Sequence, residues 1–345
     1  MLPFLRGEFA DPGRVHTEAR MTRVAIEVAR EQVATFVGAR PREVVFTSSG
    51  TEAIAHAQHW VRGHAVTSAV EHSAVRESLH RAASEVTVVG VDRTGRIDPV
   101  AVASAVRPDT EFVSIQLANH EVGTMQRAAI EQGAGARPKG ALLHVDACAA
   151  TGHTEIDFGA SGADLMSITG HKLGGPKGVG ALLVRRGLRV PPLLLGGAQE
   201  RARRAGIENV PAIVGFGAAV ATLDVQRESS AQRRLIDRAA AAATAIPGVE
   251  RFGAGDLPNL LCLGIQGIEA EPVLIGLDQR GVAAHSGSSC ASEMLEPSPV
   301  LAAMGVDAAH SLRVSVGWNT TDADIDRFTA ALTDIVTHLR TLHNQ

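Results

Sequence analysis

The chain of 345 residues is too long for one small hydrophobic core, and its length favours a large domain plus a smaller one over one extended α/β domain. A net charge of -4 provides no basic field for holding a phosphate backbone, which disfavours nucleic acid as an obligatory partner. Neither an apolar stretch of ~20 residues nor a basic-then-apolar N-terminus is present, so we expect neither membrane insertion nor export.

Two residue types are scarce. Only three of the 33 basic residues are lysines, namely Lys139, Lys172 and Lys177, and only an amine can form an imine with an aldehyde. The three cysteines form no CxxC pair and no even framework. This usage favours a reduced, cytoplasmic protein.

The first part of the chain alternates between helical and strand patterns. Apolar residues at helical spacing predict an amphipathic helix over 22–37. The run EVVFT then predicts a strand that leads through a glycine turn into a helix. Further apolar runs predict six or seven strands before Arg186, at HAVTSAV, EVTVVGVD, FVSIQLAN, ALLHVDA, DLMSITG and GALLVRR. This alternation indicates an α/β fold with a mainly parallel sheet covered by helices.

The last third of the chain has a different pattern. A long Ala-rich stretch over 210–245 predicts one or two helices, and a domain boundary near Gln226 follows from it. We therefore expect a large domain over 1–226 and a small α+β domain over 227–345. In the small domain, strands are expected at NLLCLGI, GVAAHSG and SLRVSVG, with a closing helix from Asp322 to Leu342.

Two side chains at predicted strand ends suit an aldehyde cofactor. Lys172 follows an apolar strand in the Gly-rich run DLMSITGHKLGGPKGVG, although an isolated His-Lys pair is more often a plain loop. Asp146 ends the strand of HVDA, where a buried carboxylate needs a cation or donors. A protonated pyridine nitrogen is such a cation, but a helix cap is an equally good reading of Asp146 alone.

Two further motifs lie where strands meet helices. In TSSGTEA, Ser49, Gly50 and Thr51 can cradle a phosphate at a helix N-terminus, or form a plain capping box. In VEHSAV, His72 can stack on a planar cofactor and move protons, or serve as a structural histidine.

The cysteines and one arginine complete the candidates. Cys290 lies in the polar run HSGSSCASEML ahead of a helix expected near Pro297, an exposed setting for a thiol. Cys262 reads as a buried strand residue, and Cys148 fits either packing or a pocket lining. Arg313 is flanked by apolar strand residues, so we expect its guanidinium to meet a carboxylate of the protein or of a substrate.

Three histidines, His56, His59 and His64, raise the question of a metal site. No carboxylate or cysteine at useful spacing completes a ligand set around them, so we expect no metal.

Taken together, the motifs resemble the cysteine desulfurase family within the pyridoxal-phosphate (PLP) enzymes of aminotransferase class V. The resemblance covers nearly the whole chain, through the runs SSGTEA, EHSAV, NHEVGT, HVDA, GHKLGGPKG, GGAQERARRAGIENV, GSSCASEMLEPSP and SLRVSVG. It implies the aspartate aminotransferase-like fold of PLP-dependent transferases, with a seven-stranded large-domain sheet and a homodimer. It also implies PLP as cofactor, L-cysteine as substrate and a sulfur-acceptor protein as partner.

The resemblance implies a role for each matching residue. Lys172 would be the Schiff-base lysine, Asp146 would meet the pyridine nitrogen and His72 would stack on the ring. The phosphate would be held by Gly50, Thr51, Thr169 and His171. Asn119 and His120 would contact the cofactor, Arg313 and Asn119 the substrate, and Cys290 would be the catalytic nucleophile that becomes a persulfide for sulfur transfer, as in iron–sulfur cluster assembly.

The sequence departs from the family pattern at several points. Ala149 stands in place of a glutamine, His120 in place of an asparagine and Ile207 in place of a threonine that reaches the partner subunit's phosphate. The family's usual first strand and AAT-type segment would precede Met1. Two alternatives stay open: another class V enzyme, such as an aminotransferase or β-lyase, from which a role for Cys290 would distinguish this chain, and a weakened paralogue that acts as a binding partner in sulfur transfer, which the departures suggest.

Overall fold

The computed structural model describes residues 1–7, 10–286 and 298–343. Two compact units are present. Unit 1 comprises Met1–Val89, Pro99–Leu117 and Gln126–Val225, and unit 2 comprises Gly90–Asp98, Ala118–Met125 and Gln226–Gln345. Within the described residues, no helix is both long and apolar enough to cross a bilayer.

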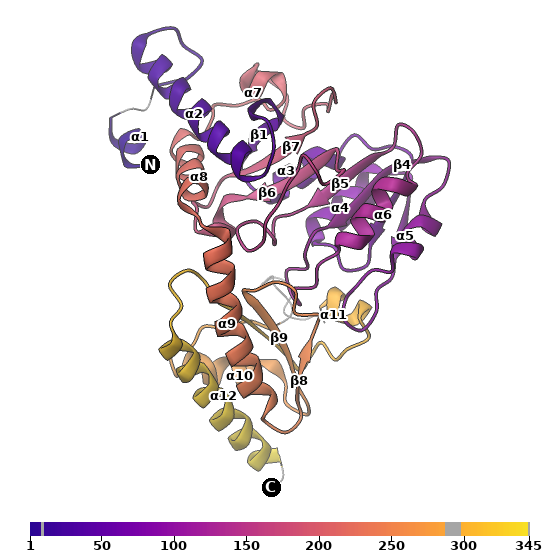
Figure 1. Ribbon diagram of the computed structural model, residues 1–345, viewed down its shortest axis with the longest axis vertical. Coiled ribbons are helices and arrows are strands. Elements are labelled where there is room, and N and C mark those ends of the chain that lie inside the picture. Colours follow the sequence, from indigo (N-terminus) through magenta and orange to yellow (C-terminus); the bar gives the residue numbers. More distant parts are fainter. Residues whose placement is uncertain (8–9, 287–297, 344–345) are drawn as a thin grey trace. The chain divides into compact units, whose positions relative to one another are not determined.

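Unit 1 is built on a seven-stranded sheet with the strand order β1-β7-β6-β5-β4-β2-β3 (Figure 1). The strands are β1 (Val44–Thr47), β2 (His64–Ser68), β3 (Glu85–Val89), β4 (Thr110–Gln116), β5 (Leu142–Asp146), β6 (Leu165–Thr169) and β7 (Gly180–Val184). β3, β2, β4, β5 and β6 pair in parallel, whereas β7 is antiparallel to both β6 and β1. The expected mainly parallel sheet is confirmed, and β1 runs in the same direction as β6.

Helices cover this sheet. They are α1 (Leu2–Arg6), α2 (Thr17–Phe36), η1 (Pro41–Glu43), α3 (Gly50–Gln58), α4 (Ser73–Ala82), α5 (Pro99–Ala105), α6 (Arg127–Ala136), η2 (Gly170–Leu173), α7 (Gln199–Ala202) and α8 (Val210–Thr222). α3 packs on β6 and β7, and α2 packs along α8 (Figure 1). The helix expected from residue 22 begins earlier, because the ring of His16 accepts a hydrogen bond from the Ala19 N–H and caps it.

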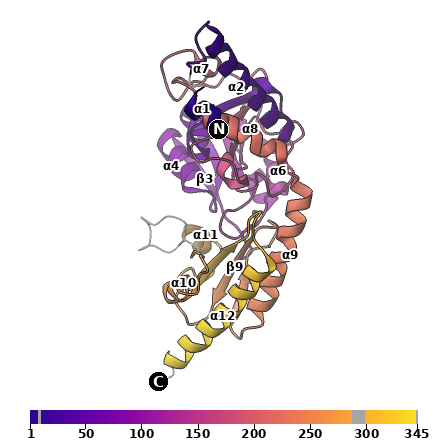
Figure 2. The ribbon, with the colours of Figure 1, turned by 90° about the vertical axis from the view of Figure 1, so that its left-hand side faces the viewer.

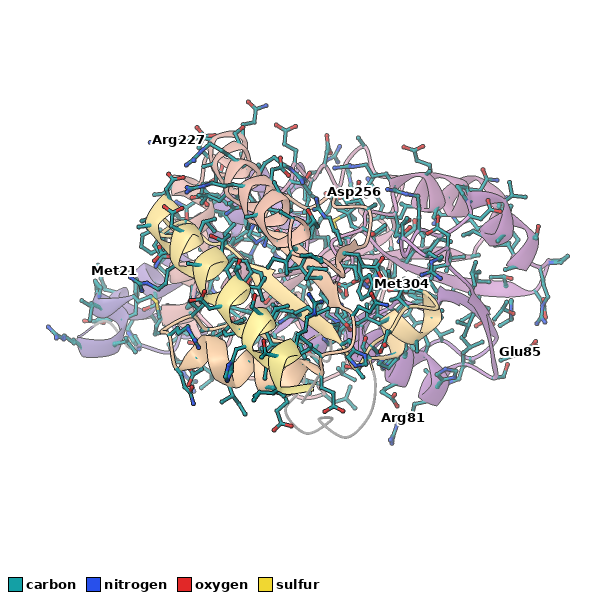
Figure 3. All side chains as sticks on the ribbon, turned by 90° about the horizontal axis from the view of Figure 1, so that it is seen from below. Met21, Arg81, Glu85, Arg227, Asp256 and Met304 are labelled. Atoms are coloured by element: carbon teal, nitrogen blue, oxygen red, sulfur yellow. The ribbon has the colours of Figure 1, made fainter. Side chains whose placement is uncertain are left out.

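The open edge of the sheet carries charge. β3 is the last strand in the order, and the carboxylate of Glu85 at its start accepts two hydrogen bonds from Arg107, at 2.7 and 2.8 Å. Figure 3 shows Glu85 and Arg81 at the periphery of unit 1, and both are exposed. Charged side chains on an edge strand discourage edge-to-edge pairing with another chain.

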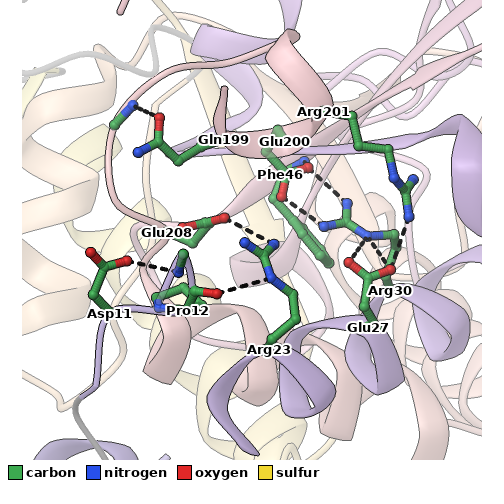
Figure 4. A network of polar contacts seen from close by, with 12 residues as sticks. Asp11, Pro12, Arg23, Glu27, Arg30, Phe46, Gln199, Glu200, Arg201 and Glu208 are labelled. Carbon is green, nitrogen blue, oxygen red and sulfur yellow. Dashed lines mark hydrogen bonds and ion pairs between the residues drawn. The ribbon is translucent and has the colours of Figure 1, made fainter. Parts of the chain in front are cut away.

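A buried ion pair joins distant parts of unit 1 (Figure 4). Arg30, on α2, donates to both carboxylate oxygens of Glu200 at 2.7 Å, and each side chain is only 2% exposed. Glu200 also accepts from the Phe46 N–H of β1 at 2.9 Å. Glu200, Arg201 and Ala202 all have positive φ, between 47° and 59°, a left-handed conformation that costs side-chain-bearing residues energy. The ion pair therefore fixes a strained turn.

Unit 2 has an antiparallel sheet in the order β10-β9-β8, formed by β8 (Val249–Phe252), β9 (Leu260–Ile265) and β10 (Ser311–Ser315). Its helices are α9 (Val225–Thr244), α10 (Ala270–Asp278), α11 (Pro299–Ala303) and α12 (Asp322–His343). α9 and α12 lie along the sheet (Figure 2), and their apolar residues form one core with the strands. The stretch 210–245, for which one or two helices were expected, forms the two helices α8 and α9, and the closing helix is confirmed as α12.

Two expectations for the small unit were wrong. The run GVAAHSG was predicted to be a strand, but residues 281–286 form only an isolated bridge from His285 to Arg313. The third strand of the sheet is β8, which pairs with β9 at the opposite edge from β10, although the sequence VERF gave no clear strand signal. Short alternating segments are decided by the partner strand rather than by their own pattern.

Candidate active site

The polar residues singled out in unit 1 follow the carboxyl ends of strands that run in one direction. The carboxyl ends of β1, β2, β5 and β6 lie at the same edge of the sheet, because these strands are parallel to one another. Such an edge is where open α/β sheets bind ligands. The predicted site residues that follow these strands are Gly50, Thr51, His72, Asp146, Thr169, His171 and Lys172.

The phosphate-cradle candidates come together across β7. Gly180 pairs with Thr47 on one side and with Thr169 on the other, so the ends of β1 and β6 flank it. The helix α3 starts after β1, with the Ser49 side chain accepting from the Glu52 N–H. A Cβ added to Gly50 would lie 3.5 Å from the Thr169 Cβ and only 2.6 Å from the Cys148 sulfur. Glycine at position 50 therefore lets the helix N-terminus approach β6.

Thr169 and His171 form a polar pair beside that N-terminus. The Thr169 hydroxyl and His171 Nδ1 are 2.9 Å apart and hydrogen-bonded. Burial, with the charge of Lys172 next in size, lowers the pKa of His171 below its usual value. A neutral imidazole, a hydroxyl and a helix N-terminus are donors suited to a phosphate group.

Asp146 is a buried carboxylate at the end of β5, with 6% of its surface exposed. Its Oδ1 accepts a hydrogen bond from the Cys148 N–H at 3.0 Å, and no cation forms an ion pair with it within the described residues. Burial and the Asp146 charge raise the pKa of the Cys148 thiol well above its usual value, whereas the Lys172 charge lowers it. The charges of Asp146 and Lys172 therefore both lie close enough to the Cys148 thiol to affect its pKa.

Lys172 lies in the short helical turn η2, directly after β6, with an exposed side chain. The turn ends at Gly174, whose φ of 82° is left-handed and suits glycine. His153 bonds to the Lys172 carbonyl oxygen through Nε2 at 3.0 Å. The lysine backbone is therefore held in place on both sides of an exposed residue.

His72 precedes α4 and caps it. Its Nδ1 accepts a hydrogen bond from the Ala74 N–H at 3.0 Å. Because Nδ1 is the acceptor, the neutral ring carries its proton on Nε2. The cap therefore fixes both the orientation and the tautomer of the imidazole.

Sequence reasoning did not single out Glu71, which is 1% exposed. Its Oε1 accepts from the Ser68 hydroxyl at 2.6 Å and from the Gln116 N–H at 3.0 Å. Burial raises the pKa of Glu71 to about 8, and the charge of Asp146 adds to this rise. A carboxylate three residues past an apolar strand, next to a candidate histidine, was the available signal.

The remaining described candidates belong to unit 2. Arg313, on β10, donates to the His120 carbonyl oxygen at 3.3 Å, and burial lowers the pKa of its guanidinium. The side-chain oxygen of Asn119 accepts from the N–H groups of Glu121 and Val122, which shapes the turn around His120. The structure therefore brings Arg313 and the 119–122 turn together.

The last candidates are two cysteines and the histidines considered as metal ligands. Cys290 lies outside the described residues. Cys262 is fully buried on β9, as expected, and burial raises its pKa to about 12. His64 bonds to the hydroxyls of Thr110 and Thr87, and the described residues contain no group of three potential ligands around a metal position.

Comparisons with known proteins agree with this fold and site. A model of the family "Aminotransferase class-V" matches residues 1–328. The chain is 39% identical over 359 residues to "Cysteine desulfurase IscS" of Methanosarcina thermophila, covering 99% of this chain and 89% of that protein. It is 40% identical to "Cysteine desulfurase" of Nostoc sp., covering 99% and 90%.

Solved structures with the same fold carry related titles. A "NIFS-LIKE PROTEIN" superimposes with a TM-score of 0.89 at 29% identity, covering 98% of this chain and 94% of that chain. "SspA in complex with cysteine" gives a TM-score of 0.78 at 28% identity, covering 91% and 92%. The chain therefore belongs to the aminotransferase class-V family, and within it to the cysteine desulfurases.

PLP is the cofactor of this family, and the residues present fit it. A buried carboxylate without an ion-pair partner among the described residues suits a protonated pyridine nitrogen. Because Gly50 has no side chain, the N-terminus of α3 can approach Thr169 and remain open to a phosphate. The exposed Lys172 follows β6, the strand that ends at Thr169. The chemistry of these donors thus matches a cationic ring, a phosphate and an aldehyde.

Proposed function

We propose that this chain is a PLP-dependent cysteine desulfurase that takes sulfur from L-cysteine, releases L-alanine and holds the sulfur as a persulfide on Cys290. The observation that carries the proposal is the common edge of unit 1, where Asp146, Lys172 and the N-terminus of α3 follow strands of one direction. The named relatives support the choice of cysteine over other amino acids.

Four groups in unit 1 would hold the cofactor. Asp146 would keep the ring nitrogen protonated, His72 would stack on the ring, and Lys172 would bind the aldehyde. The phosphate would meet Gly50, Thr51, Thr169 and His171. When bound, PLP supplies an electron sink that stabilises negative charge at the substrate α-carbon.

Proton movement would use the groups at the same edge. The amine of Lys172, once released by the incoming substrate, would remove the α-proton. Because His72 Nδ1 accepts from the Ala74 N–H, the neutral ring carries its proton on Nε2, and His72 would transfer that proton. The substrate carboxylate would bind Arg313, with Asn119 and His120 shaping that part of unit 2.

The sulfur step would take place at Cys290. Its thiolate would attack the substrate sulfur, so that an S–S bond forms and the substrate C–S bond breaks. The electron pair of the broken bond stays on the substrate carbon, which becomes the methyl group of alanine after protonation. The persulfide would then pass its terminal sulfur to an acceptor protein. We further propose a cytoplasmic homodimer, supported by the family and by a sequence with three cysteines and no CxxC pair.

The test is incubation of the purified protein with L-cysteine, followed by measurement of alanine and sulfide. Lys172→Ala should abolish both products, and Cys290→Ala should abolish the protein persulfide. If Cys290→Ala keeps full turnover, the chain is instead a class V enzyme of the β-lyase or aminotransferase kind. If the wild type shows no visible PLP absorption after cofactor is added, it is a weakened paralogue, as Ala149 and Ile207 would suggest.

A further inference from the structure

Glu71 lies between the two strand ends that carry His72 and Asp146. Its Oε1 is bonded to Ser68, the last residue of β2, and to the backbone N–H of Gln116, the last residue of β4. One carboxylate oxygen therefore connects the turn after β2 to the neighbouring strand.

The connection is made in both directions. The Gln116 side chain donates from Nε2 to the Val70 carbonyl oxygen at 2.7 Å, so the turn 69–72 is held by two bonds to one residue. We refer to these two contacts, Glu71 Oε1 to Gln116 N–H and Gln116 Nε2 to Val70 O, as the Glu71–Gln116 link. Both side chains are at most 2% exposed, so no solvent competes for these bonds.

The same glutamine is attached to Asp146. Gln116 is the register partner of Asp146 in the parallel pair of β4 and β5, and the next residue, Leu117, donates its N–H to the Asp146 carbonyl oxygen at 2.7 Å. The link thus ties the backbone next to His72 to the backbone next to Asp146. The proposed function puts these two residues on one cofactor ring, His72 on its face and Asp146 at its nitrogen.

We propose that Glu71 is a positioning residue for the cofactor, and that the Glu71–Gln116 link sets His72 and Asp146 in register for one PLP ring. This inference rests on the proposed function. Glu71 would not itself contact the cofactor or the substrate. It would act through His72 and Asp146, whose positions the link sets.

The contacts of Glu71 indicate which of its carboxylate oxygens positions the turn. Its Oε2 is buried and has no hydrogen-bond partner within the described residues, so this oxygen contributes no link. Burial in this setting disfavours the charged form. Oε1 therefore positions the turn by accepting hydrogen bonds. Glutamine keeps that acceptor, so Glu71→Gln should position the turn as the wild type does.

The experiment is titration of cofactor-free protein with PLP, followed by visible absorption and visible circular dichroism of the bound cofactor. We expect Glu71→Leu to weaken PLP binding by ~10-fold or more and to change the dichroism, because a buried pair of hydrogen bonds is lost. We expect Glu71→Gln to bind within ~3-fold of the wild type, with its dichroic signal restored, since the acceptor is kept.

Glu43 offers a matched control in the same unit. It is 7% exposed and, like Glu71, accepts two hydrogen bonds, in this case both from backbone N–H groups, of Arg40 at 2.8 Å and of Arg186 at 3.0 Å. It precedes β1, at the opposite end of that strand from Gly50. Glu43→Leu should lower the unfolding temperature as Glu71→Leu does, while PLP affinity and dichroism stay as in the wild type.

Equal PLP affinity and dichroism in Glu71→Leu and the wild type would overturn the inference, as would a Glu71→Gln variant as weak as Glu71→Leu. Should Glu71→Leu not fold, Gln116→Met removes the bond to Val70 alone; it should weaken PLP binding ~3-fold or more, and wild-type behaviour would overturn the inference. A wild type that binds no PLP would instead refute the proposed function, so the two failures are distinguishable.

Discussion

Gly50 and Cys148 leave no room for a further carbon atom between them. A Cβ at position 50 would lie 2.6 Å from the Cys148 sulfur, well inside van der Waals contact. We predict that Gly50→Ala costs about 1–3 kcal/mol in the free energy of unfolding, because the core has to shift to accept it. Urea unfolding of the cofactor-free protein measures this loss.

A double-mutant cycle tests whether the contact with Cys148 causes this loss of stability. Cys148→Ala removes the sulfur, so in its background Gly50→Ala should cost less than half as much. If the two losses simply add, the close contact is not the cause. The result bears on the cofactor as well, because the same glycine lets the N-terminus of α3 approach Thr169.

The buried Glu71 makes stability depend on pH. Its pKa is about 8 in the folded chain, against roughly 4.3 when unfolded, so the folded state binds the extra proton between these values. Stability must then fall as the pH rises through this window and level off above it. The unfolding temperature of Glu71→Gln, which has no such proton, should exceed that of the wild type increasingly from about pH 5 to about pH 9. A constant difference would contradict the raised pKa.

At the scale of elements, the Arg30–Glu200 ion pair fastens the left-handed turn of α7 to α2 and β1. Removing one partner leaves the other charge buried, so we predict that Arg30→Met and Glu200→Gln each cost about 3–5 kcal/mol. Chemical denaturation measures these losses. Arg201, 44% exposed and paired with Glu27 at 3.0 Å, is the control: Arg201→Met should cost below about 1 kcal/mol. Equal losses for Arg30→Met and Arg201→Met would contradict the assignment.

The strands and helices of unit 1 could be predicted from the sequence because their patterns are local. EVVFT and ALLHVDA are apolar runs bounded by turn residues, and Ser49 is a good helix cap. The Arg30–Glu200 pair could not be predicted, because its partners are 170 positions apart and either arginine or glutamate alone reads as a surface residue. The prediction of a strand at GVAAHSG was wrong for a different reason, since this short apolar run pairs with β10 through a single bridge only.

In the candidate site too, features with a local sequence pattern could be predicted and features that depend on distant contacts could not. Lys172, Asp146, His72 and Gly50 were suggested by motifs at strand ends, and the structure places all four after strands of one direction. Their catalytic roles remain predictions. Glu71 could not be predicted from the sequence, because its proposed role depends on a contact with Gln116. Only the pairing of β2 and β4 creates that contact.

For the whole molecule, cofactor binding should be linked to folding. A ligand that binds only the folded state stabilises it by about 2.7 kcal/mol at a hundredfold excess over its Kd. We predict that PLP raises the unfolding temperature and slows hydrogen exchange at residues 47–51, 146–148 and 169–172. Lys172→Ala should lose most of both effects. Protection confined to unit 2 would place the cofactor elsewhere.

The interrupted make-up of unit 2 bears on synthesis of the chain. Two of its pieces, Gly90–Asp98 and Ala118–Met125, leave the ribosome well before Gln226–Gln345, with which they pack. At roughly 5–20 residues per second, these early pieces wait for about 5–50 s without their neighbours. Arg96, for example, meets Asp256 only after 160 further positions have been translated. The small unit is thus finished last, and a nascent chain stalled near Val225 would still lack most of it.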